Sequence, residues 1–244
     1  MFGPPKVLIA VITCHKYRER ADACRKTWVT KVGKRADVRF FIGRRPEDAP
    51  KLDPLPDEIQ LDCPDSYEYL PLKVWLMFRW ATTHNYKLVF KTDDDSYIQP
   101  DELLRTLPKE HYVGHANSNG HGEVFATGWW SGLGYWVTRR AMGMVLRHEP
   151  PVGESEDRWV GTVLTGYGIH PTNDDGIYPA SCTPQRNAVH AGTKCTAELS
   201  PEDMWLAFDG PHGWRERAAV AEFKRAQQLR QQKITRGDGT RFFQ

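Results

Sequence analysis

Runs of consecutive apolar residues alternate with helical patterns in the first hundred residues of the chain. The run KVLIAVIT at residues 6–13 is almost wholly apolar, which is typical of a strand buried on both faces. Three further strands and two helices are predicted after it, with a Pro- and Asp-rich connection before the third strand. The further strands are residues 38–43, 58–64 and 87–90, and the helices are residues 18–32 and 70–84. This alternation predicts a mostly parallel sheet with crossover helices, and therefore an α/β fold.

The second half of the chain has a less regular pattern. Residues 111–116 have the composition of a strand, and residues 128–142 indicate a glycine-rich turn, a strand and the start of a helix. An amphipathic helix is predicted at residues 154–166. From about residue 213 the pattern predicts a charged helix and a polar tail. That helix is expected either to be solvated, which is the commoner case, or to rest on an anionic membrane.

Three consecutive aspartates, Asp93, Asp94 and Asp95, follow the strand at residues 87–90. Ligands of parallel sheets bind beyond the carboxyl ends of the strands, where Thr13 is also expected. Three adjacent carboxylates repel one another, and their hard oxygen atoms suit Mg²⁺ or Mn²⁺. Aspartate is also common in solvated turns and helix caps, so the run alone leaves both interpretations open. Its position at a strand end favours a metal site.

A second acidic pair and one histidine are further candidates. Glu156 and Asp157 begin the amphipathic helix, where acidic residues either complement the helix dipole or place a general base beside a substrate hydroxyl. His190 follows an apolar dipeptide, and a lone histidine is more often structural than a metal ligand. The chain contains nine histidines, so spacing alone does not single this one out.

Two adjacent tryptophans, Trp129 and Trp130, lie in a glycine-rich stretch. Neighbouring side chains of a strand point to opposite faces, so one indole is expected to pack in the core. The other would be free to stack on the apolar face of a sugar. The pair is therefore a candidate binding surface for a carbohydrate.

Composition excludes several classes of protein. The 244 residues suffice for one domain or two small ones, and a net charge of +2 gives no support for nucleic-acid binding. No apolar run approaches the roughly 20 residues of a membrane span, so the chain as given is expected to be soluble. Its five cysteines lack the spacing of a zinc site. Cys182 and Cys195 either form a disulfide in an oxidising compartment or stay reduced.

Five stretches, taken together and in this order, resemble glycosyltransferase family 31. This family comprises inverting β-1,3-glycosyltransferases, among them β-1,3-galactosyltransferases and Fringe-type enzymes. No single motif is specific, but the combination is. The stretches are ACRKTW (23–28), DCPDSYEYLPLKV (62–74), FKTDDDSYI (90–98), SGLGYWVTRRA (131–141) and SEDRWVGTVL (155–164).

The resemblance implies a GT-A fold and a division of the chain. Residues 1–211 would be one catalytic domain, with a nucleotide-sugar-binding half at 6–98 and a smaller acceptor-binding half at 99–211. Residues 212–244 would be the charged C-terminal helix and tail. A UDP-sugar donor, Mn²⁺ or Mg²⁺, and a carbohydrate or glycoconjugate acceptor are also implied. Because animal members are anchored in the Golgi, a trimmed chain would act in the Golgi lumen and a natural full-length one in the cytoplasm.

The resemblance also implies roles for individual residues. Asp95 would ligate the metal, with Asp93 near the ribose or the waters of the metal. Asp157 would be the catalytic base, supported by Glu156. The remaining candidates are a further metal ligand, His190; the nucleotide-site residues Thr13, Arg18, Arg25, Lys73, Asp93 and Asp94; and the acceptor-site residues Trp129, Trp130 and Tyr135.

The implied reaction transfers a hexose with inversion from a UDP-sugar to the 3-hydroxyl of an acceptor sugar, forming a β-1,3 linkage. Galactose is the expected hexose because it is frequent in the family. The stretch TGWWSGLGY replaces the family's usual lead-in to the Ser-Gly segment, so the acceptor is left open. The alternative is a non-catalytic nucleotide- or sugar-binding module on the same fold, which has no need of the acidic pair. A metal-dependent phosphohydrolase would require more His and Asp ligands on several strand ends.

Overall fold

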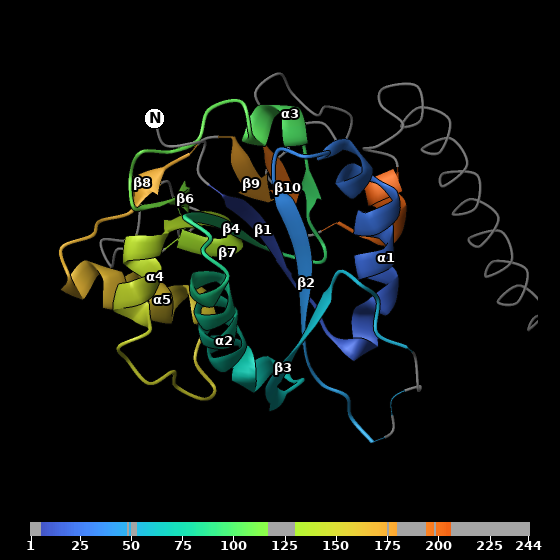
Figure 1. Ribbon diagram of the computed structural model, residues 1–244, viewed down its shortest axis with the longest axis horizontal. Coiled ribbons are helices and arrows are strands. Elements are labelled where there is room, and N and C mark those ends of the chain that lie inside the picture. The colour runs from blue at the N-terminus through green and yellow to red at the C-terminus, as the bar shows by residue number, and fades with distance from the viewer. Residues whose placement is uncertain are drawn as a thin grey trace, which may run out of the picture.

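The computed structural model of the chain describes residues 6–47, 49, 53–116, 130–174, 176–179, 194–197 and 199–205. The strands of its central sheet are β1 (Val7–Ile12), β2 (Asp37–Arg44), β3 (Glu58–Pro64), β4 (Leu88–Asp93), β6 (Tyr112–Ala116), β7 (Trp130–Thr138) and β8 (Thr172–Asn173). They form a seven-stranded sheet in the order β3-β2-β1-β4-β7-β6-β8 (Figure 1). The first four of these strands run parallel, whereas β7 is antiparallel to both β4 and β6. The predicted α/β fold with a mostly parallel sheet is confirmed.

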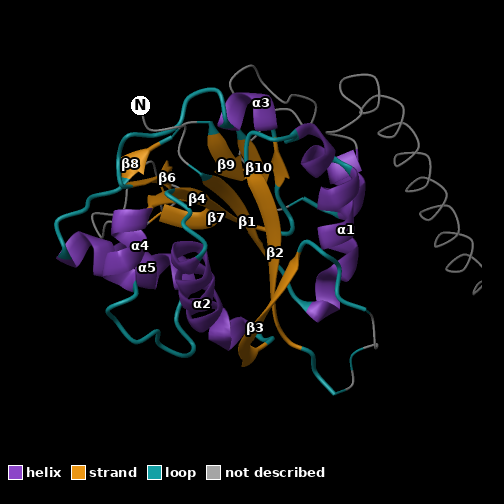
Figure 2. Ribbon diagram, viewed as in Figure 1, coloured by secondary structure: helices purple, strands orange, loops and turns teal. Residues whose placement is uncertain are grey.

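Helices cover both faces of this sheet (Figure 2). The helices are α1 (Arg18–Lys26), α2 (Leu70–Thr83), α3 (Pro100–Leu103), α4 (Arg139–Val145) and α5 (Glu156–Gly166). One face packs against α2, α4 and α5, and the other against α1 and α3. A smaller sheet of β5 (Tyr97–Ile98), β10 (Cys195–Ala197) and β9 (Ile177–Pro179) shares the hydrophobic core on the α1 side.

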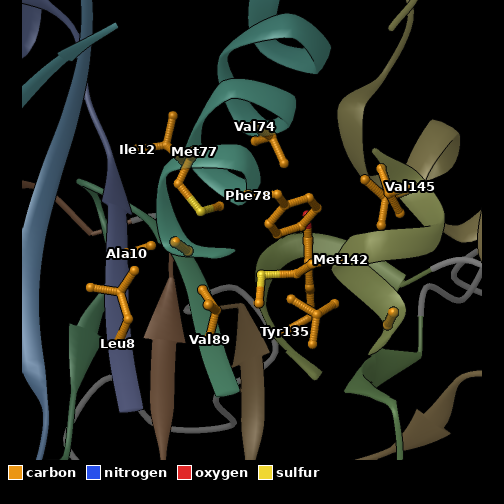
Figure 3. Close-up of a cluster of buried hydrophobic side chains, with 14 of the residues drawn as sticks. Leu8, Ala10, Ile12, Val74, Met77, Phe78, Val89, Tyr135, Met142 and Val145 are labelled. Atoms are coloured by element: carbon orange, nitrogen blue, oxygen red, sulfur yellow. The ribbon is translucent and has the colours of Figure 1, made fainter. Parts of the chain in front are cut away.

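Both faces of β1 are buried, as its continuous apolar sequence predicts. Leu8, Ala10 and Ile12 point to the cluster formed with α2 and α4 (Figure 3). The intervening side chains, Val7, Ile9 and Val11, point to the cluster beneath α1. Full burial of a large apolar side chain contributes about 1.5–3 kcal/mol. The central strand is therefore a rigid support for whatever its carboxyl end carries.

The helix predicted at residues 18–32 is shorter in the structure. α1 ends at Lys26, because the hydroxyl of Thr27 bonds the Ala23 carbonyl at 2.6 Å and its backbone leaves the helical conformation. A 3₁₀ turn at Trp28–Lys31 follows. This break allows the buried indole of Trp28 to donate to the Ser96 carbonyl at 3.0 Å. A tertiary contact thus overrides the local helical pattern.

The carboxyl ends of β1 and β4 meet at one edge of the sheet. Ile12 and Asp93 are register partners, and the backbone N–H of Asp94 donates to the Ile12 carbonyl at 3.1 Å. Thr13 directly follows β1, and its backbone N–H donates to the carbonyl of Phe41 in β2. The fold therefore brings Thr13 and the aspartates together where ligands of parallel sheets bind.

Candidate active site

The acidic run lies where β4 ends. Asp94 is buried, and its Oδ2 accepts a hydrogen bond from Thr13 Oγ1 at 2.7 Å. Asp93 and Asp95 flank it with side chains that are 39% and 30% exposed. Burial, together with repulsion from Asp93 and Asp95, raises the pKa of Asp94 to about 7, and burial also raises the pKa of Asp95. Negative charge is concentrated and unfavourable here, and such a site favours a cation.

One arginine of α1 faces these carboxylates. Arg20 Nη1 lies 3.5 Å from Asp95 Oδ2 and 3.9 Å from Asp94 Oδ1. Its guanidinium also stacks over the Tyr17 ring, 4.2 Å from the ring centroid. Sequence reasoning missed Arg20, because the stretch YRER offers two arginines and does not tell which one faces the sheet edge. Its contacts with Asp94 and Asp95 place Arg20 at the acidic edge of the sheet.

A buried lysine connects the acidic edge to α5. Lys91 Nζ lies 2.9 Å from Asp93 Oδ1 and 3.0 Å from Glu156 Oε2, and the hydroxyl of Tyr135 donates to the other oxygen of Glu156. Burial alone would lower the pKa of Lys91, but the stronger effect of the carboxylates of Asp93 and Glu156 raises it above its ordinary value. Burial raises the pKa of Glu156 against the opposing effect of Lys91. Tyr135, a predicted acceptor residue, is fully buried, and it contacts the site through its bond to Glu156 and through Lys91, whose Nζ lies 5.7 Å from the centroid of the Tyr135 ring.

The predicted base, Asp157, is the second residue of α5. Its side chain is half-buried, and its Oδ1 accepts bonds from the Ser155 hydroxyl and, at 2.8 Å, from the backbone N–H of Arg158. These local bonds orient the carboxylate at the helix N-terminus, where the dipole stabilises its charge. Both of these bonds are to Oδ1 of the carboxylate.

Lys73, predicted to line the nucleotide site, is fixed in a buried network. Its Nζ lies 2.6 Å from Asp65 Oδ1 and donates to the Thr13 carbonyl at 2.9 Å. Asp65 also accepts the backbone N–H of Gly43 at 2.9 Å and that of His15 at 2.6 Å. The network joins the loops after β1 and β3 to the end of β2. The network fixes the positions of these loops at the edge of the sheet. The ammonium of Lys73 is already bound by Asp65 and the Thr13 carbonyl.

Two predicted nucleotide-site arginines pair with acidic residues at the start of β3. Arg25 contacts Asp57 at 3.0 Å, Glu58 at 2.9 Å and Asp22 at 2.9 Å. Arg18 contacts Glu58 at 3.3 Å. Glu58 begins β3, so both guanidinium groups are bound away from the carboxyl end of that strand. Among the described residues, the ion pairs of Arg25 are with Asp22, Asp57 and Glu58, and not with Asp93, Asp94 or Asp95.

Comparison with known families gives an independent result. The family model described as Galactosyltransferase matches residues 19–130, which include α2, the acidic run and all of α1 except its first residue. Over this range the chain is similar to the galactosyltransferase family. The resemblance to glycosyltransferase family 31 is thereby confirmed.

The curated relatives of the chain are distant. Beta-1,3-galactosyltransferase 1 of Mus musculus is 25% identical over 210 residues, covering 71% of this chain and 64% of the relative. UDP-GalNAc:beta-1,3-N-acetylgalactosaminyltransferase 1 of Homo sapiens is 32% identical over 221 residues, covering 70% of this chain and 64% of the relative. The chain thus spans less than two thirds of the length of these relatives.

A solved structure shares the fold. The crystal structure of a glycosyltransferase involved in the glycosylation of the major capsid of PBCV-1 aligns with a TM-score of 0.53 at 12% sequence identity. The alignment covers 84% of this chain and 99% of that one. The expected GT-A fold is consistent with this match and with the mostly parallel sheet.

The donor atoms of the acidic run suit a divalent cation. Asp93 and Asp95 offer partly exposed carboxylate oxygens, the hard ligands that Mn²⁺ and Mg²⁺ prefer. Within the described ranges, no group of three or more His, Cys, Asp or Glu residues is arranged to hold a metal. These carboxylates would therefore supply part of a coordination shell, and diphosphate or water oxygens the rest.

Some residues with predicted roles lie outside the described residues. These are Trp129, His190 and Cys182, together with the helix expected from about residue 213. For Trp130 only the backbone, at the start of β7, is described. Cys195 is buried close to Thr92. The two alternatives for Cys182 and Cys195, a disulfide or reduced thiols, both stay predictions. Every helix in the described ranges is too short or too polar to span a bilayer.

Proposed function

We propose that the chain is an inverting, metal-dependent glycosyltransferase. It transfers a hexose from a UDP-sugar to the 3-hydroxyl of an acceptor sugar and forms a β-1,3 linkage. The observation that carries this proposal is the set of three carboxylates at the carboxyl end of β4, directly beside the end of β1. Similarity to the galactosyltransferase family supports the reaction class, and the sheet edge is where a nucleotide binds in α/β folds.

The donor site is formed by the acidic edge and its neighbours. Asp95 and Asp93 would hold Mn²⁺ or Mg²⁺, with His190 as a predicted further ligand. The chemistry that such a cation supplies is stabilisation of the negative charge on the departing diphosphate. Thr13 fixes Asp94 through a 2.7 Å hydrogen bond, so the turn that carries the two ligands is held in place.

Asp157 acts as the general base. Its carboxylate accepts the proton of the acceptor 3-hydroxyl while that oxygen attacks the anomeric carbon from the face opposite the leaving group. A single displacement of this kind inverts the configuration, so an α-linked donor gives a β-linked product. The same division of roles is found in inverting glycosidases, where one carboxylate activates the nucleophile.

Galactose is the proposed donor sugar. The names of the two relatives support a UDP-hexose of the galactose series, because one names galactose and the other N-acetylgalactosamine. Single residues of the sugar pocket decide between such donors, so the choice is open to direct measurement. Trp129 and Trp130 stay the proposed acceptor surface.

Release of UDP tests the proposed function. The chain is incubated with Mn²⁺ and, separately, UDP-galactose, UDP-N-acetylgalactosamine, UDP-N-acetylglucosamine or UDP-glucuronate. We expect slow release of UDP from one donor and faster release when sugar acceptors are added. Removing the cation with a chelator should stop the release of UDP, and adding Mn²⁺ back should restore it. Binding of UDP without release under all these conditions would contradict transfer and favour a non-catalytic binding module.

A further inference from the structure

The ion network around Lys91 is set by the register of the sheet. Lys91 and Asp93 are two residues apart on β4, so their side chains point to the same face. Tyr135 is the antiparallel partner of Lys91 on β7 and shares that face. The first residue of α5, Glu156, is packed against the same face. The strand register and the packing of α5 therefore bring the side chains of these four residues together on one face of the sheet.

Burial makes this contact costly unless every charge is matched. The side chains of Lys91 and Glu156 are 2% and 5% exposed, and each depends on the other for its ionised form. One ammonium lies between two carboxylates, of which Asp93 is partly exposed at the sheet edge. Well-packed apolar residues often stabilise a fold as well as a buried ion pair does. An arrangement that ends at the proposed donor site therefore suggests a role beyond stability.

We propose that Lys91 is a positioning residue that fixes the start of α5 relative to the acidic edge. The inference rests on the proposed function, since Glu156 is followed directly by Asp157. Lys91 holds Glu156, and Glu156 holds the first turn of α5 that carries the base. The same ammonium holds Asp93, so one side chain sets the geometry of the donor side and the acceptor side together.

Kinetics of Lys91→Met test this role, with Lys87→Met as the matched control. Lys87 is exposed one residue before β4 begins, so its substitution should leave turnover unchanged. For Lys91→Met we expect kcat to fall by about 10²-fold, because misplacement of a catalytic group by ~1 Å has effects of that size. KM for the donor should change less than kcat does, because Asp95 keeps its place in the donor site while the base is misplaced. An unchanged kcat would overturn the proposal.

A double-mutant cycle shows whether Lys91 acts through Glu156. If it does, Lys91→Met combined with Glu156→Gln should lower kcat no further than Lys91→Met alone. Multiplication of the two separate losses would mean that the residues act independently and would overturn the proposal. Tyr135→Phe removes only a hydroxyl and should give a smaller loss in the same direction.

Hydrogen exchange tests positioning in the free protein, independently of activity. In Lys91→Met, amides of α5 should exchange faster than in the wild type, and those of α2 should not. Faster exchange throughout both helices would indicate a general structural role, and no change in α5 would exclude positioning; either result overturns the proposal. If Lys91→Met does not fold, the same comparison is made with Tyr135→Phe. A wild-type chain that releases no UDP would contradict the proposed function, and the exchange result would still decide whether Lys91 positions α5.

Discussion

The carboxyl edge of the sheet has two sides that handle charge differently. On the β1–β3 side, the buried side chains of Lys73 and Asp65 are 2% and 1% exposed and form a 2.6 Å ion pair. The backbone N–H groups of His15 and Gly43 bond the same carboxylate. One positive and one negative charge balance there, and both oxygens of Asp65 have partners. We call this the closed side.

On the β4–α5 side, carboxylates outnumber cations. Among the described residues, Asp93, Asp94, Asp95 and Glu156 share two cationic ion-pair partners, Lys91 and Arg20. The excess negative charge raises the pKa of Asp94 and Asp95, after the larger effect of burial. We call this the open side. The comparison teaches that the closed side fixes the shape of the edge, whereas the open side has charge left over for a ligand.

The largest expected effect is on the open side and concerns function. Asp157→Asn should lower kcat by about 10²–10⁴-fold, the usual contribution of a general base. Its bonds are local and its helix-dipole interaction is worth about 0.3–1 kcal/mol, so stability should change little. UDP release gives kcat, calorimetry gives the UDP affinity, and Asp101→Asn on α3 is the exposed control. Parallel losses of UDP affinity and kcat would refute the assignment of Asp157 as base.

On the closed side, the expected effect is on stability. Lys73→Met leaves Asp65 buried without its cation, and breaking such a pair costs about 3–5 kcal/mol. Chemical denaturation should show this loss, and the exposed Lys87→Met should change the free energy of unfolding by less than about 0.5 kcal/mol. A loss below about 1 kcal/mol for Lys73→Met would mean that the closed side is not fixed by its ion pair.

The strand and helix pattern of the sequence was sufficient for the fold because the central strands β1 and β4 are buried on both faces. Consecutive apolar residues in β1 had to be buried on both faces, and the strand end had to lie at the ligand edge. The break at Thr27 was not predictable from the sequence. It accompanies the burial of Trp28 and the hydrogen bond of its indole to the Ser96 carbonyl, and that contact exists only in the folded core.

Side-chain partners in the site were less predictable than positions along the chain. Arg18 and Arg20 are two residues apart on α1, about 200° around the helix axis, so they point in opposite directions. Periodicity alone does not tell which direction faces Asp95. Lys91 was similarly overlooked, because its partner Glu156 is distant in sequence and is brought close only by the packing of α5.

A smaller effect on the closed side is expected from Gly43. A Cβ atom at this position would lie 2.8 Å from the Asp65 Cα and 2.9 Å from the Cys63 carbonyl oxygen, both of them backbone atoms. Gly43→Ala should therefore lower the free energy of unfolding by about 1–3 kcal/mol, as overpacking does. Gly143→Ala on α4 is the control, since its Cβ would meet no atom within 4 Å and alanine should stabilise the helix by about 0.5–1 kcal/mol. Equal effects of both substitutions would contradict a tightly packed closed side.

The smallest effect is expected on the open side, from Arg20→Gln. The guanidinium is 33% exposed and 3.5 Å from Asp95, and such a pair is worth up to about 1 kcal/mol. Because Arg20 competes with a cation for the same carboxylate, its removal should raise the affinity for Mn²⁺ alone by about 2- to 5-fold. Titration with Mn²⁺ followed by electron paramagnetic resonance measures this, and Arg35→Gln, which loses an exposed contact to Asp101, is the matched control. Weaker Mn²⁺ binding would place Arg20 among the groups that support the metal rather than compete with it. Unchanged binding would mean that the cation binds away from Asp95, and the contrast between the two sides would no longer explain the site.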